Sequence, residues 1–83
     1  MEDLIFYTAK KCAPCRVMEK KLDSIKNQLA FKIKKVYVDD IEDPSKIDVF
    51  STPAIKIVKN GTKITGDVDL IDLRNILMRN LYR

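Results

Sequence analysis

The chain is organised around the stretch Leu4-Ile5-Phe6-Tyr7-Thr8-Ala9-Lys10-Lys11-Cys12-Ala13-Pro14-Cys15. Its first part, Leu4 to Thr8, is a short apolar run typical of a strand buried on both faces. Apolar residues then recur at helical spacing, which predicts an amphipathic helix from about Pro14 to Gln28. Its apolar stripe consists of Val17, Met18, Leu22, Ile25 and Leu29. The two cysteines therefore lie at a strand-to-helix junction, where Pro14 suits the first helical turn.

The rest of the chain continues this alternation of strands and helices. Asp43-Pro44 looks like an N-cap followed by a proline in the first turn, and Asn60-Gly61 is the dipeptide that a type I′ hairpin turn prefers. The predicted elements are a strand over residues 31–38, a short helix to about Val49, strands over residues 54–58 and 62–65, and a helix over residues 69–81. The order β-α-β-α-β-β-α predicts one α/β domain over residues 1–83, with a four-stranded mixed sheet flanked by helices.

Length and composition exclude several classes of protein. The chain has 83 residues, of which 46% are hydrophobic and 34% charged, a balance typical of a single globular domain. No apolar run is long enough to span a membrane, and the acidic N-terminus does not resemble a secretory signal, so we expect a cytoplasmic protein. The absence of histidine excludes histidine-based catalysis, and two glycines cannot form a glycine-rich phosphate loop.

The net charge of +4 raises the question of nucleic-acid binding. The lysines are scattered along the chain, however, and no run reaches the five like charges typical of a binding tail. We therefore interpret them as a solvated surface and do not expect a nucleic-acid partner.

The cysteine pair is better suited to chemistry than to stability. A bridge across two intervening residues, Ala13 and Pro14, constrains little of the unfolded chain. The positive end of a helix dipole stabilises a thiolate at Cys12, and Lys10 and Lys11 add positive charge if their side chains turn toward the sulfur. Cys12 would then attack a substrate disulfide, and Cys15, one turn inside, would resolve the mixed disulfide.

Two other interpretations of the pair remain open at this point. Both cysteines could be buried structural residues, although a helix N-terminus is usually partly exposed. They could also form half of a metal site, but zinc needs four ligands, and the chain has neither a second cysteine pair nor a histidine. Only two chains sharing one metal would complete such a site, so we expect no metal.

The order of these motifs resembles that of the thioredoxin-like oxidoreductases, and in length the chain is similar to the small glutaredoxins. The resemblance covers essentially the whole chain and implies a minimal thioredoxin-like fold. Thr52-Pro53 stands where the family places a cis-proline opposite the cysteines, and Gly66 resembles the glycine before the last helix. The resemblance implies that Thr52, Pro53 and Gly66 contact the substrate, with the backbone of Thr52 pairing with a substrate strand.

The sequence also departs from the pattern of thioredoxins. Lys11 stands where a tryptophan usually precedes the first cysteine. Phe6 stands where thioredoxins hold a buried carboxylate that assists deprotonation of the resolving thiol. Lys35 resembles the lysine that pairs with that carboxylate, so the sequence predicts a lysine without its family partner.

The resemblance implies a small thiol-disulfide oxidoreductase that reduces protein disulfides as a monomer, without a bound cofactor. Its electrons would come from a thioredoxin-reductase-like enzyme or a low-molecular-weight thiol. One alternative is a glutathione-dependent glutaredoxin, although Val68 stands where a glutathione-binding carboxylate is expected. Another is a binding module without enzymatic activity.

Overall fold

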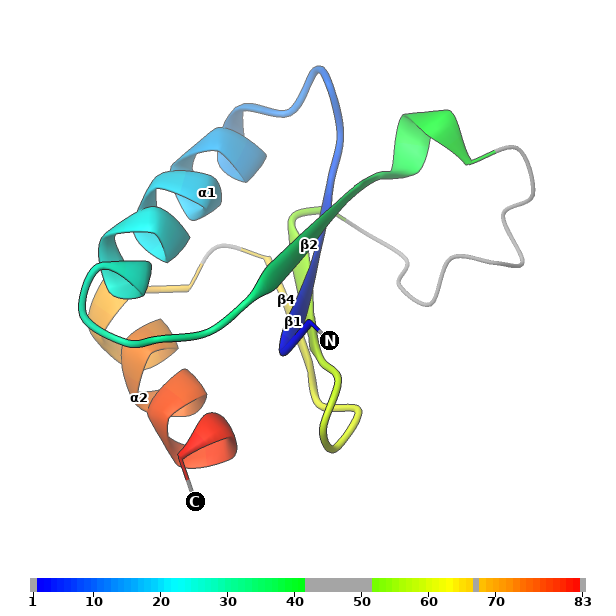
Figure 1. The fold of residues 1–83 in the computed structure, drawn as a ribbon. Coiled ribbons are helices and arrows are strands. Elements are labelled where there is room, and N and C mark those ends of the chain that lie inside the picture. The colour runs from blue at the N-terminus through cyan, green and yellow to red at the C-terminus, as the bar shows by residue number, and fades with distance from the viewer. Residues whose placement is uncertain (1, 42–51, 67, 83) are drawn as a thin grey trace.

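The computed structural model of the chain describes residues 2–41, 52–66 and 68–82 (Figure 1). Within these residues, four strands and two α-helices form the body of the fold, and one short 3₁₀ helix, η1, follows the second strand. In chain order they are β1 (Leu4–Thr8), α1 (Ala13–Lys26), β2 (Ile33–Tyr37), η1 (Val38–Asp40), β3 (Ala54–Ile57), β4 (Lys63–Thr65) and α2 (Leu70–Leu81).

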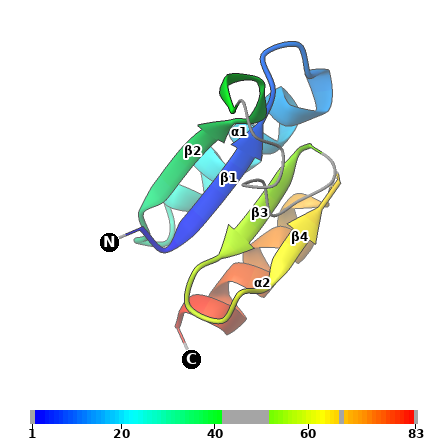
Figure 2. The ribbon, with the colours of Figure 1, turned by 90° about the vertical axis from the view of Figure 1, so that its right-hand side faces the viewer.

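The strands form one mixed sheet in the order β2-β1-β3-β4 (Figure 2). β1 and β2 are parallel, which requires a crossover, and α1 provides it. β3 is antiparallel to β1, and β4 is antiparallel to β3 at the sheet edge. The α/β class and the four-stranded mixed sheet predicted from the sequence are therefore confirmed.

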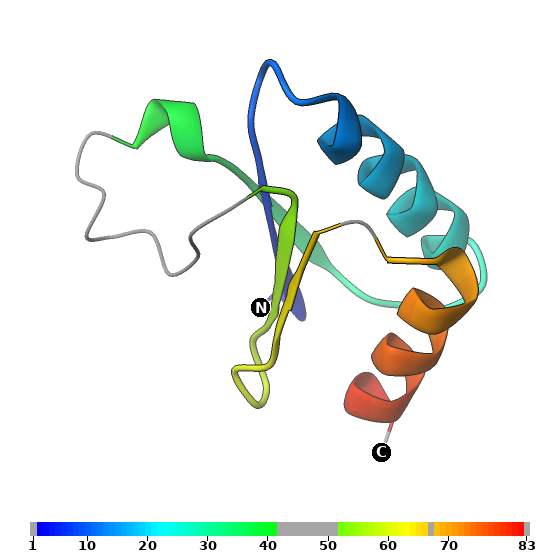
Figure 3. The same cartoon turned by 180° about the vertical axis from the view of Figure 1, so that it is seen from behind.

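Both α-helices lie on the same side of the sheet, and the core lies between them and the strands (Figures 1 and 3). Leu4 and Phe6 of β1 point into this core because they are two residues apart on one strand. Each helix contributes a stripe at helical spacing. The stripes consist of Met18, Leu22 and Ile25 on α1 and of Leu73 and Leu77 on α2. The core thus fixes α1, and the cysteines at its first turn, against β1.

The element boundaries differ from the prediction by a few residues. β2 begins at Ile33, two residues later than predicted. Phe31 is buried and packs against the core, but it lies before the strand. Val17 is 45% exposed, so it does not belong to the apolar stripe of α1. Val38 belongs to η1, which the sequence did not predict because a three-residue turn has no periodicity. The short helix expected to end near Val49 lies outside the described residues.

The predicted type I′ turn at Asn60-Gly61 is wrong. That turn needs a positive φ at both central residues, but within the described chain only Gly61 and Gly66 have one. Ile57 closes a wider loop instead: its N–H donates to Thr62, and its carbonyl accepts from the Gly61 N–H, both at 2.8 Å. The Asn60 carboxamide accepts from the Thr62 N–H at 3.0 Å, and this hydrogen bond stabilises the wider loop.

Candidate active site

Cys12 and Cys15 form a disulfide at the N-terminus of α1. Cys12 is the N-cap residue, and its Sγ accepts a hydrogen bond from the Cys15 N–H at 3.2 Å. Cys12 is half-buried, whereas Cys15 is only 1% exposed. The helix start thus directs its N–H groups toward the more accessible sulfur, which is where a thiolate gains most stabilisation.

The Thr52-Pro53 segment lies next to this pair. Its peptide bond is cis, as the resemblance implied. The Thr52 hydroxyl donates to Cys12 Sγ at 3.8 Å, and Pro53 is buried. The Gly66 N–H donates to the Pro53 carbonyl at 3.0 Å, so the residue that follows β4 supports the cis-proline. The fold therefore brings Cys12, Thr52, Pro53 and Gly66 to the same end of the sheet.

The Lys10 side chain pairs with a carboxylate on η1. Its ammonium lies 3.0 Å from an Asp40 oxygen, and its backbone N–H donates to Asp39 at 2.6 Å. The hydrogen bond and charge of Asp40 raise the pKa of Lys10 above its usual value. The Lys10 ammonium, which was expected to support Cys12, is therefore directed at Asp40 and ties the loop before Cys12 to η1. Three further predicted supporting residues, Lys11, Ala13 and Pro14, are exposed around the disulfide.

A hollow of about 310 Å³ borders the buried cysteine. Residues from the end of β1, the first turns of α1 and the end of β2 surround it. They are Thr8, Ala9, Lys10, Cys15, Arg16, Glu19 and Tyr37. The hollow gives the vicinity of Cys15 a path to solvent on the side of the helix.

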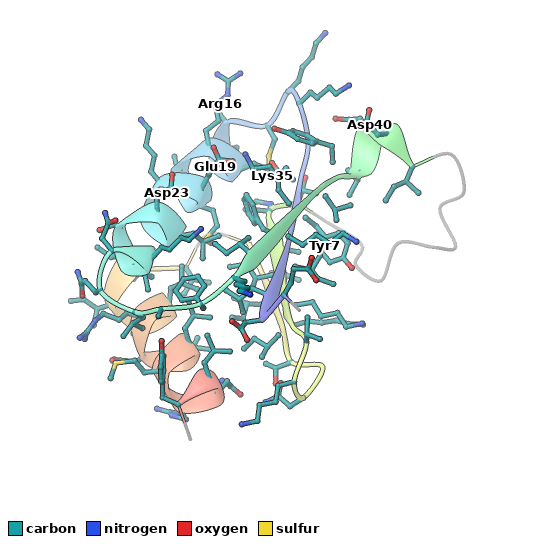
Figure 4. The ribbon with its side chains drawn as sticks, viewed as in Figure 1. Tyr7, Arg16, Glu19, Asp23, Lys35 and Asp40 are labelled. Carbon is teal, nitrogen blue, oxygen red and sulfur yellow. A yellow bond between two sulfur atoms is a disulfide. The ribbon has the colours of Figure 1, made fainter. Side chains whose placement is uncertain are left out.

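Glu19 provides the partner that Lys35 was predicted to lack. The Lys35 ammonium forms an ion pair with Glu19 and lies 5.7 Å from the ring centre of Tyr37 (Figure 4). The hydrogen bond to Glu19, opposed in part by burial, raises the pKa of Lys35 above its usual value. Phe6 is 1% exposed in the core, so β1 contributes no carboxylate at that position.

Sequence reasoning missed Glu19 and Asp40 as members of this site. Glu19 follows Cys15 by four residues, and this spacing places two side chains on one face of a helix. The sequence therefore carries a signal for Glu19 on α1, whereas the family pattern points to a position on β1. Asp40 had no local signal, because its contact with Lys10 spans 30 residues.

In the described part of the chain, no group of three or more potential ligand residues is arranged to hold a metal ion. Among the same residues, no helix has the length and apolar character needed to cross a membrane.

Comparison with known families identifies the fold. The family model described as thioredoxin matches residues 2–79. The chain belongs to the thioredoxin family. It is 36% identical to thioredoxin 1 of Nostoc sp., over 94% of this chain and 78% of that protein. It is 30% identical to the thioredoxin of Griffithsia pacifica, over 94% of this chain and 77% of that protein.

Solved thioredoxin structures share the fold. Thioredoxin 1 of Thermosipho africanus superposes with a TM-score of 0.76 at 19% identity, covering 95% of this chain and 93% of its own. The Fasciola hepatica thioredoxin superposes with a TM-score of 0.77 at 24% identity, covering 93% of this chain and 78% of its own. This thioredoxin-family protein is a thiol-disulfide oxidoreductase, and its family works through a redox-active disulfide without a cofactor.

Proposed function

We propose that this thioredoxin-family protein reduces disulfides of other proteins, with Cys12 as the nucleophile and Cys15 as the resolving thiol. One observation carries the assignment. The half-buried sulfur of Cys12 caps α1 beside the cis Thr52-Pro53 segment, while Cys15 is almost fully buried behind it. An incoming disulfide can therefore reach Cys12 but not Cys15.

The exchange takes place in two steps. The Cys12 thiolate attacks one sulfur of the substrate disulfide, which forms a mixed disulfide and releases the other substrate sulfur as a thiolate. The Cys15 thiol then loses its proton and attacks Cys12 Sγ, which forms the Cys12-Cys15 disulfide and releases the second substrate thiolate. Two electrons pass from the dithiol to the substrate, and the two thiol protons end on the substrate thiols.

The surroundings of Cys12 fit an extended substrate. The Thr52 hydroxyl lies 3.8 Å from Cys12 Sγ, so we assign the Thr52 backbone to pairing with a substrate strand. We assign Pro53 and Gly66, which are joined by a backbone hydrogen bond, to the same contact. We assign the electron supply to a thioredoxin-reductase-like enzyme or a low-molecular-weight thiol in the cytoplasm, with the protein acting as a monomer. The thioredoxin matches do not favour the glutaredoxin alternative or a non-enzymatic module.

The test is turnover of a disulfide-bonded protein such as insulin, with dithiothreitol as reductant. Cys12→Ser should abolish the catalysed rate, because it removes the nucleophile. In a separate reaction without dithiothreitol, pre-reduced Cys15→Ser should accumulate a mixed disulfide with the substrate, which mass spectrometry detects as an adduct. Lys59→Ala, in the hairpin at the far end of β3, should retain the wild-type rate. Full activity of Cys12→Ser would reject the proposal.

A further inference from the structure

The assigned mechanism leaves one proton without an acceptor. Cys15 is 1% exposed, and Phe6 occupies the β1 position where thioredoxins hold a buried carboxylate. The thiol proton of Cys15 must therefore leave toward a group that borders it on another side.

We propose that Glu19 accepts the proton of Cys15, through water in the hollow that both residues border, when Cys15 resolves the mixed disulfide. The inference rests on the proposed function and adds a proton-accepting residue to it. Glu19 follows Cys15 by one helical turn, so the two side chains share a face of α1. An acceptor can act through a single bridging water, which does not require direct contact with the sulfur.

The other groups around the hollow are poor proton acceptors. Lys10 and Arg16 offer hydrogen-bond donors but no acceptor, and the phenol oxygen of Tyr37 is a far weaker base than a carboxylate. Thr8 carries a hydroxyl, which is a far weaker base than a carboxylate. Among the residues that surround this hollow, Glu19 is the only carboxylate.

Lys35 holds the Glu19 carboxylate in place from the sheet. The ammonium of Lys35, on β2, pairs with Glu19 and also lies over the Tyr37 ring at 5.7 Å. Figure 4 shows Glu19 on α1 and Lys35 on β2 meeting across the gap between the two elements. The Glu19 side chain is 39% exposed, so a proton that it accepts can pass on to solvent.

The resolving step then balances as follows. A water molecule takes the Cys15 proton and passes one of its own protons to Glu19. The Cys15 thiolate attacks Cys12 Sγ and displaces the substrate thiolate, which takes a proton from solvent. Glu19 returns its proton to solvent, so the resolving step consumes no further reactant, and the external electron donor then reduces the Cys12-Cys15 disulfide.

The experiment separates attack from resolution. Reduced protein is mixed with 5,5′-dithiobis(2-nitrobenzoate) in a stopped-flow instrument, where attack by Cys12 and resolution by Cys15 each release one coloured thiolate. Glu19→Gln should slow the second phase by about tenfold or more near pH 7 and leave the first unchanged. The defect should shrink as the pH rises toward about 9, because hydroxide then competes with the carboxylate for the thiol proton.

Asp23→Asn is the matched control, since Asp23 lies one turn further along α1 and does not border the hollow of Cys15. Its two phases should match those of the wild type. Unchanged or faster resolution in Glu19→Gln overturns the inference, as does a defect that is constant from about pH 6 to about pH 9. These outcomes leave the proposed function standing, because that function depends on the Cys12→Ser result.

Discussion

In this protein Phe6 occupies the position on β1 where thioredoxins hold a buried carboxylate, and a carboxylate lies instead on α1, at Glu19. An unpaired carboxylate in the core costs several kcal/mol of folding free energy, whereas a phenylalanine at the same place contributes apolar burial. Glu19 lies at the rim of the core, where water and Lys35 both solvate its charge. The carboxylate of Glu19 thus borders the same hollow as Cys15, while Phe6 belongs to the cluster of buried apolar side chains that forms the core.

At the residue scale, Lys35→Met tests the ion pair with Glu19. Both side chains are 39% exposed, so we expect a loss of less than about 1 kcal/mol in the free energy of unfolding. Folding raises the pKa of Lys35 above its ordinary value of 10.5, so the pair contributes fully below that pH. The contribution is lost as the pH rises through the folded-state value, when the ammonium is neutralised.

Urea unfolding of both proteins at several pH values provides the measurement. The difference between them should be constant from about pH 6 to about pH 9 and should shrink above about pH 10.5. Lys34→Met, at the adjacent exposed position of β2, is the control and should change stability by less than about 0.5 kcal/mol. A difference that grows at high pH would contradict the assignment.

At the scale of the element, the loop of the β3-β4 hairpin contains one residue with a left-handed backbone conformation. Gly61 has a φ of +76°, and nothing lies within 4 Å of a Cβ added there. A side chain at this position therefore meets no neighbour, and the cost of a substitution comes from the left-handed backbone alone. The Asn60 and Asn80 carboxamides, which pair at 2.6 Å, hold the loop against α2 and limit its freedom to rearrange.

Gly61→Ala should lower the free energy of unfolding by about 1 to 2 kcal/mol, the cost of a left-handed conformation for an alanine. Gly61→Asn should cost less, because asparagine tolerates that region better than other L-residues. Chemical unfolding of the two variants measures the difference. Equal losses in both would show that the hairpin changes its turn on substitution.

Prediction from the sequence worked for the elements that bury a face and failed for contacts between distant segments. β1 and α2 match their predicted ranges to within one residue, because packing on a core imposes spacings of two and of three to four. The turn at Gly61 and the 3₁₀ helix η1 are too short to show a period. The pairing of Glu19 with Lys35 joins a helix to a strand, and only the packing of α1 on the sheet brings the two together.

At the scale of the molecule, the disulfide contributes less to the free energy of unfolding than the core does. In the chain-entropy estimate, a bridge between residues three apart is worth at most about 2 kcal/mol. A domain of this length has a total stability of roughly 4 to 12 kcal/mol. The fold can therefore survive each reduction and oxidation of the cysteines, as a redox cycle requires.

Shortening a buried side chain of the core should lower the free energy of unfolding more than reducing the disulfide does. Leu77 is completely buried between α2 and the sheet, and Leu77→Ala should cost about 2 to 5 kcal/mol. Met78, its neighbour on α2, is 38% exposed, and Met78→Ala should cost well under half of that. Denaturant unfolding of the wild type in both redox states, and of both variants in the oxidised state, gives the comparison. If reduction destabilised the protein more than Leu77→Ala does, the disulfide would be a structural staple, because a bond that held the fold together could not open once in every catalytic cycle.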